Sequence, residues 1–172
     1  MFGEFDFYSG HGANNNGQSL LLPSDFRTDL IDDSSITKEG FLQQIADQNP
    51  KHIFAFFDAC FSGLSREGET LIAGLRNISI VEEEVPFSNI TIFNSASGAE
   101  FSSDFDEVGH GLFSYYLMKG LEGEADNNSD QQISTSELYD YIYANVSEQS
   151  INLGPQQNPS LITNDDQIIV KW

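Results

Sequence analysis

The sequence of 172 residues contains a single cysteine, Cys60, and no long apolar run. One thiol cannot form a disulfide within the chain, and it cannot supply a cysteine-rich zinc site. No segment approaches the ~20 apolar residues of a membrane-spanning helix. The acidic, aromatic N-terminus is also unlike a signal peptide. We therefore expect a cytoplasmic protein that has no membrane partner.

Basic residues are also scarce. Seven Lys and Arg stand against 27 Asp and Glu, which gives a formal net charge of −20. Such a charge repels phosphate backbones and anionic lipids, so nucleic acid is excluded as an expected partner, whereas basic ligands are attracted. Hydrophobic residues make up 39% of the chain, which is typical of a globular protein. The length suits a single domain over residues 1–172.

The pattern of apolar residues predicts strands that alternate with helices. We expect strands at residues 4–8, 52–57, 89–94 and 168–170, helices at residues 37–47, 111–121 and 135–147, and a turn followed by a polar loop at residues 9–18. The second and third strands are almost continuously apolar, as strands are when helices cover both faces of a parallel sheet. The predicted fold class is therefore α/β, with a mainly parallel sheet flanked by helices.

Two chemically reactive side chains each follow one of these strands. The first strand runs into Tyr8-Ser9-Gly10-His11-Gly12, and the second into Asp58-Ala59-Cys60-Phe61-Ser62-Gly63. Functional groups in open α/β sheets collect at the carboxyl ends of strands, so the imidazole and the thiol converge if the two strands are neighbours. A nearby imidazole supplies the base or the cation that turns a thiol into a nucleophile. The glycines leave room for a substrate backbone and for N–H groups that point at an oxyanion.

The two motifs together resemble the paired signature of caspase-like cysteine peptidases, in particular the metacaspase and bacterial caspase-like branch. His11 lies 49 residues before Cys60, and caspases place their histidine about 50 residues before the cysteine. Residues 21–25, 111–117 and 157–161 are also similar to the family. The resemblance implies a caspase-like fold over nearly the whole chain. We expect this fold to lack the first strands of the family, because few residues precede the histidine strand.

The resemblance also implies a function, that of a cysteine endopeptidase which uses no metal and no cofactor. Cys60 attacks the carbonyl carbon of the scissile bond in such an enzyme. His11 activates the thiol or protonates the leaving amine. The backbone N–H groups of Gly12 and Cys60 form the oxyanion hole.

Asp58 stands where metacaspases carry an aspartate that lines a pocket for arginine or lysine. Ser95 and Glu100 resemble positions that complete this pocket. The expected partner is therefore a peptide or protein substrate with a basic residue before the cleaved bond, whose side chain pairs with carboxylates. The alternative role of Asp58 is to cap the turn after its strand.

The two other histidines have structural interpretations. His110 lies 50 residues after Cys60, and papain-like peptidases use this order of cysteine and histidine. However, His110 introduces a predicted helix, whereas His11 ends a predicted strand, so we favour His11. His52 begins a strand, and we expect it to be structural.

Residues 126–137 leave a second function open. Asp126, Asn128, Asp130 and Glu137 occupy positions 1, 3, 5 and 12 of an EF-hand loop between two predicted helices. Gln131 stands where the sharp turn of that loop normally requires glycine. The segment either binds calcium or is a solvated connection between helices. The alternative to an enzyme is a catalytically inactive caspase-like binding module, with calcium-dependent binding as one form of it.

Overall fold

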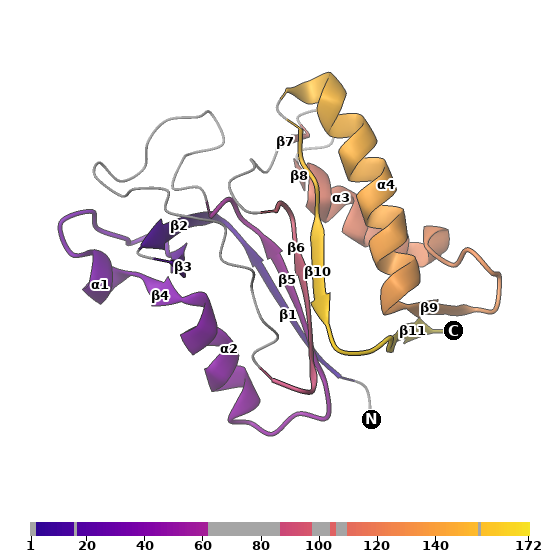
Figure 1. Cartoon of the computed structure of the whole chain (residues 1–172), viewed down its shortest axis with the longest axis horizontal. Helices are drawn as coiled ribbons and strands as arrows, with labels where there is room; N and C mark the ends of the chain where they lie inside the picture. Colours follow the sequence, from indigo (N-terminus) through magenta and orange to yellow (C-terminus); the bar gives the residue numbers. More distant parts are fainter. Residues whose placement is uncertain (1–2, 16, 62–86, 98–103, 106–109, 155) are drawn as a thin grey trace.

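The computed structural model describes residues 3–15, 17–61, 87–97, 104–105, 110–154 and 156–172. Its centre is a four-stranded sheet in the order β1-β5-β6-β10 (Figure 1). These strands are β1 (Glu4–Ser9), β5 (Ile53–Asp58), β6 (Ile90–Asn94) and β10 (Ser160–Thr163). The first three run parallel, and β10 is antiparallel to β6. The predicted α/β class with a mainly parallel sheet is therefore confirmed.

Helices cover both faces of this sheet, which explains why β5 is apolar at almost every position. In Figure 1, α2 (Lys38–Ala46) lies on one side of the sheet, and α3 (Leu112–Lys119) and α4 (Thr135–Leu153) lie on the other. Alternate side chains of a strand point to opposite faces. Phe57 accordingly packs into a core with residues of α2, whereas Phe56 packs into a second core with residues of α3 and α4.

The helices begin at residues whose side chains cap them. The hydroxyl of Thr37 accepts a hydrogen bond from the N–H of Gly40 at 3.0 Å, so the predicted start of α2 is confirmed. Ser134 caps α4 in a reciprocal arrangement with Glu137. α4 runs six residues beyond its predicted end at residue 147, because the buried stripe of the helix continues to Ser150.

The expectation of a turn and a polar loop over residues 9–18 is wrong. β2 (His11–Asn15) and β3 (Gln18–Leu22) pair there as an antiparallel hairpin. Gly17 has a φ of 89°, and its N–H donates to Oδ1 of Asn14 at 2.9 Å, which closes the turn. Leu20 and Leu22 of β3 pack with Ala13 of β2 into a small core of their own, whereas Leu21 packs into the core that contains Phe57. This packing orders the polar strand that pairs with them.

The C-terminal strands also differ from the prediction. The strand expected at residues 168–170 exists as β11 (Ile168–Lys171), but it pairs with β9 (Gln132–Ser134) in a separate two-stranded sheet. The fourth strand of the main sheet is instead β10, for which the sequence predicts no strand. All residues of β10 are only partly buried. An edge strand of this kind carries a weak apolar pattern.

The remaining elements are short. They are α1 (Ile31–Ser34), β4 (Ile36–Thr37), β7 (Asp104–Phe105), β8 (His110–Gly111) and a π-helical turn at Gly120–Glu124 that follows α3. β4 adds a third strand to the hairpin of β2 and β3. Within the residues that the structure describes, no helix is long and apolar enough to cross a membrane.

Among the strands that the structure describes, β1 lies at one end of the main sheet, with Phe5 and Phe7 on one face and Glu4 and Asp6 on the other. Phe5 and Phe7 are 46% and 54% exposed. On the other face, Oδ2 of Asp6 is buried and has no hydrogen-bond partner among the described residues. Burial raises the pKa of Asp6, and the nearby carboxylate of Glu4 raises it further. The folded protein therefore holds a proton on Asp6 more tightly than the unfolded chain does.

This pKa shift predicts a pH-dependent effect of Asp6→Asn. Because the folded-state pKa is raised, ionised Asp6 destabilises the fold progressively as the pH rises through that pKa. We expect Asp6→Asn to raise the free energy of unfolding relative to wild type near pH 7, and the difference to vanish at about pH 3, where carboxyls are protonated. Urea unfolding at a series of pH values measures this. Asp140→Asn removes the same charge from an exposed position of α4, and an identical pH profile for both variants would contradict the prediction.

Candidate active site

The parallel ladder of β1 and β5 brings the predicted histidine and cysteine to one edge of the sheet. Ser9 pairs with Asp58 at the end of this ladder, and the N–H of Gly10 donates to the carbonyl of Asp58 at 3.2 Å. His11 and Cys60 each lie two residues beyond the paired ends. The two strands are direct neighbours, which is the condition for their reactive side chains to converge.

The loops that carry the two side chains touch each other at Gly12. A Cβ atom on Gly12 would lie 3.0 Å from the carbonyl oxygen of Cys60 and 2.9 Å from the ring of Phe61. Only a residue without a side chain permits this approach. Cys60 is 5% exposed, whereas His11 is exposed at the start of β2. The arrangement brings the backbones of Gly12 and Cys60 together, and their roles as oxyanion-hole donors stay a prediction.

Asp58 ends β5 and is completely buried. The hydroxyl of Ser114 in α3 donates a hydrogen bond to Oδ2 of Asp58. A Cβ atom on Gly111, the residue before α3, would overlap this carboxylate oxygen. The carboxylate therefore lies against the N-terminus of α3, where the helix dipole favours a negative charge. This places a buried carboxyl group two residues before Cys60.

Ser95 follows β6 and lies beside the segment that joins Asp58 to Cys60. Its N–H donates to the carbonyl of Phe57 at 2.8 Å, and its hydroxyl to the carbonyl of Ala59 at 3.4 Å. The side-chain amide of Gln157 donates to the carbonyl of Ser95 at 2.8 Å. Both Ser95 and Gln157 are fully buried. Glu100 and Gly63, which the sequence analysis also selected, lie outside the described residues.

Lys38, the first residue of α2, is only 4% exposed, a burial that the sequence does not predict. Its ammonium group donates to Oδ1 of Asn94 at 2.7 Å. It also lies 4.6 Å and 5.2 Å from the ring centres of Phe57 and Phe61. A lysine in the first turn of a helix opposes the helix dipole. This unfavourable position of a lysine is the feature of the sequence that indicates stabilising contacts with residues outside the helix.

The other two histidines lie directly before β5 and within β8, and their structural roles stay predictions. Nε2 of His52 is 3.0 Å from the hydroxyl of Thr91, and its ring lies 4.6 Å from that of Phe54. Burial lowers the pKa of His52. His110 is exposed in β8, directly before α3.

The loop at residues 126–137 uses its oxygen atoms for its own backbone. The N–H of Asp130 bonds to oxygens of both Asp126 and Asn128, and Glu137 accepts from the N–H of Ser134 at 3.0 Å. Gln131 has a φ of 64°, so the residue in the place of the loop glycine adopts the left-handed conformation. Among the described residues, no group of three His, Cys, Asp or Glu is arranged to hold a metal ion.

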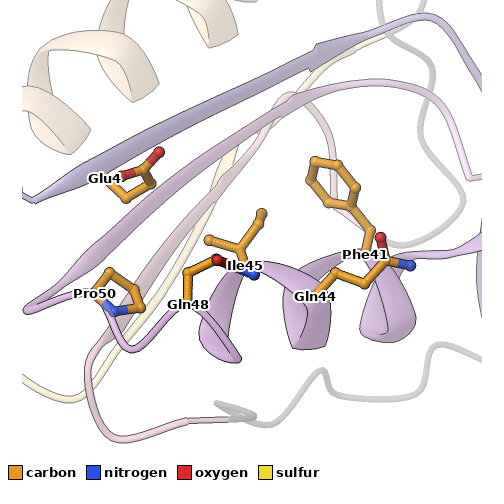
Figure 2. A pocket seen from close by; sticks show the side chains of 6 residues that line it. All are labelled: Glu4, Phe41, Gln44, Ile45, Gln48 and Pro50. Atoms are coloured by element: carbon orange, nitrogen blue, oxygen red, sulfur yellow. The ribbon is translucent and has the colours of Figure 1, made fainter.

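A hollow of about 200 Å³ lies at the opposite end of the sheet from His11 and Cys60. Figure 2 shows side chains of α2 that face the beginning of β1 across it. Its lining comprises Glu4, Phe41, Gln44, Ile45, Gln48 and Pro50. Glu4 begins β1, so the hollow lies near the amino ends of the strands. It is therefore separate from the candidate active site at the carboxyl ends.

The fold and the site together define a class of protein. A mainly parallel sheet with a histidine and a cysteine beyond the carboxyl ends of neighbouring strands is a cysteine peptidase-type fold of the caspase kind. The chain belongs to the caspase domain family, whose family model matches residues 5–166. The predicted resemblance to caspase-like cysteine peptidases is therefore confirmed, and the roles of individual residues stay predictions.

The chain is also similar in structure to caspase-1 from Spodoptera frugiperda. The two share a TM-score of 0.57 at 16% sequence identity, which is a likeness of fold. The match covers 92% of this chain and 58% of that chain. This chain thus spans little more than half of the length of that protein. No curated protein matches the sequence.

The contact at Gly12 predicts the effect of adding one methyl group there. Gly12→Ala would force the His11 and Cys60 loops apart, because the new Cβ approaches Cys60 and Phe61 too closely. We expect a loss of about 1–3 kcal/mol in the free energy of unfolding, as for an overpacked core, and slower alkylation of Cys60 by iodoacetamide. Urea unfolding and mass spectrometry of the alkylated protein measure both effects. Ser9→Ala adds no atoms nearby and is the control; equal behaviour of the two variants would refute the packing argument.

Proposed function

We propose that the chain is a cysteine endopeptidase that cleaves peptide bonds after arginine or lysine, with Cys60 as nucleophile and His11 as its partner. The main support for this proposal is the register of β1 and β5. Because Ser9 pairs with Asp58, His11 and Cys60 each follow two residues after the last pair of the ladder. The contact between Gly12 and the carbonyl of Cys60 supports the same assignment.

The chemistry follows from these positions. His11 takes the proton of the Cys60 thiol, and the thiolate attacks the carbonyl carbon of the scissile bond. The carbonyl oxygen becomes an oxyanion that faces the N–H groups of Gly12 and Cys60. The C–N bond then breaks, the imidazolium of His11 gives its proton to the leaving amine, and a thioester remains on Cys60. Water hydrolyses the thioester to release the acid and restore the thiol.

The buried carboxylate of Asp58 supports a preference for basic residues. An acidic substrate side chain brought beside it meets repulsion, and an unpaired buried charge is costly. A guanidinium pairs with a carboxylate through two hydrogen bonds. A charge-assisted hydrogen bond contributes roughly 1.5–3 kcal/mol, which corresponds to about 10- to 150-fold in rate if it forms in the transition state. The net charge of −20 favours the same substrates.

The first prediction from this function concerns covalent labelling. A peptidyl inhibitor that ends in arginine and carries a thiol-reactive group should modify Cys60 stoichiometrically. Cys60→Ala should abolish both labelling and peptidase activity, because the chain contains no other thiol. His11→Ala should keep the thiol but lose rapid labelling. Intact-mass spectrometry measures the adduct. An unreactive Cys60 in the folded wild-type protein would instead favour the catalytically inactive binding module.

The second prediction concerns substrate choice. In a panel of fluorogenic peptides that differ only in the residue before the cleaved bond, we expect the order arginine, then lysine, with negligible cleavage after aspartate. Asp58→Asn should selectively lower kcat/KM for the basic substrates by about 10-fold or more. In this variant, the reactivity of Cys60 toward small alkylating agents should stay close to that of wild type.

Asp140→Asn is the matched control for this variant, because it makes the same change of net charge at an exposed position of α4. It should leave the substrate order and the rates unchanged. Faster cleavage after aspartate than after arginine in the wild-type protein would overturn the pocket assignment while leaving Cys60 as nucleophile.

A further inference from the structure

The hydroxyl of Tyr8 lies directly beneath the segment that carries the histidine. It is 2.7 Å from the carbonyl oxygen of His11 and 3.2 Å from the carbonyl oxygen of Leu22. It also accepts a hydrogen bond from the N–H of Leu22 at 3.2 Å. A phenol has one proton to donate, and the shorter distance assigns that proton to His11. His11 and Leu22 face each other where β2 and β3 meet, so the hydroxyl joins β1 to the end of this hairpin.

Two packing contacts hold the Tyr8 ring in this position. Its ring centre lies 6.5 Å from that of Phe57, on the face of the sheet that packs against α2. Gly10 passes over the hydroxyl, and a Cβ atom there would lie 2.9 Å from the phenol oxygen. Burial raises the pKa of Tyr8, although the hydrogen bond with Leu22 lowers it. The phenol thus remains protonated, and able to donate, at neutral pH.

His11 needs such an anchor because its own side chain is exposed. A packed side chain is held by its neighbours, whereas an exposed imidazole is held through the backbone that carries it. Besides the pairing of His11 with Leu22 in the hairpin, two hydrogen bonds among the described residues hold this backbone beyond the β1 ladder. One runs from the N–H of Gly10 to Asp58, and the other from Tyr8 to the carbonyl of His11.

We propose that Tyr8 is a positioning residue, whose hydroxyl fixes the backbone of His11 and thereby holds the imidazole in reach of Cys60. This inference rests on the proposed function, in which His11 and Cys60 act as a pair. The reactivity of the thiol depends on an imidazole that stays nearby. Loss of the hydroxyl therefore weakens the pair without removing either reactive group.

The test is the pH profile of Cys60 alkylation by iodoacetamide, which requires no peptide turnover. At about pH 6 an isolated thiol with its pKa near 8.5 is almost fully protonated, so reaction there reports a thiolate stabilised by His11. We expect Tyr8→Phe to slow alkylation at this pH about 10-fold, the loss of roughly one hydrogen bond. At a pH above 9, where the thiol ionises unaided, its rate should match that of wild type. On an arginyl substrate, kcat should fall by a similar factor and KM should stay unchanged.

Tyr139→Phe is the matched control. The hydroxyl of Tyr139 in α4 also donates to a backbone carbonyl, that of Pro159 at 3.4 Å. Loss of this hydroxyl should leave unchanged the rate of Cys60 alkylation near pH 6, which we call the acidic limb of the pH profile. Circular dichroism establishes that each variant is folded. Should Tyr8→Phe fail to fold, Gly10→Ala provides a second variant, because its methyl group displaces the phenol without deleting the hydroxyl. It should slow alkylation in the same pH range.

The outcomes separate the two proposals. If His11→Ala loses the acidic limb while Tyr8→Phe and Gly10→Ala keep it, Tyr8 has no positioning role and the His11–Cys60 pair stands. If wild type and His11→Ala have the same profile, the pair itself is absent, and both proposals fail. Loss of the acidic limb in Tyr8→Phe but not in Tyr139→Phe supports the positioning role.

Discussion

The parallel pairing of β1 with β5 is the interaction on which the candidate active site depends. The ladder runs without a shift from Glu4 opposite Ile53 to Ser9 opposite Asp58. A slip by one residue would move His11 along the strand by about 3.3 Å relative to Cys60 and turn every side chain of β1 to the other face. Such a slip would place Glu4 and Asp6 among the phenylalanines of β5. The register is therefore fixed by the same packing that forms the core.

The alternation of side chains at the end of β5 gives the two sides of the site different chemistry. Phe57 points toward α2, where the ammonium of Lys38 lies 4.6 Å from the centre of its ring. Asp58 points the other way, toward α3, and accepts the hydrogen bond of Ser114. A strand with helices on only one face has no such second partner. The three-layer arrangement thus places an aromatic surface and a buried carboxylate on opposite sides of the segment that ends in Cys60.

The sequence was sufficient for what is encoded locally. The apolar run at residues 52–57 predicted β5, and the apolar pattern at residues 37–47 predicted α2. The two glycine-flanked motifs lie just beyond the paired ends of β1 and β5, and the roles of His11 and Cys60 stay predictions. Contacts between distant segments leave no such trace. The hydrogen bond from Ser114 to Asp58 joins residues 56 positions apart, and no local sequence pattern around either residue predicts it. Lys38 is buried for the same kind of reason, because Asn94 and Phe61 reach it from other elements. β10 escaped prediction since an edge strand needs little apolarity to pair with β6.

The histidine side of the site has fewer constraints than the cysteine side, and this asymmetry explains the contacts around it. β5 lies between two strands and is buried along its whole length. β1 is a terminal strand of its sheet in the part of the chain that the structure describes, with Phe5 and Phe7 about half exposed. A strand held by one ladder opens locally more easily than a central strand. The bonds of Gly10 and Tyr8, together with the close approach at Gly12, tie the histidine segment to β5 and to β3 beyond the reach of the ladder. The position of the histidine segment thus depends on contacts beyond the β1 ladder, because Tyr8 of β1 reaches the carbonyls of His11 and Leu22, while Gly10 and Gly12 contact Asp58 and Cys60.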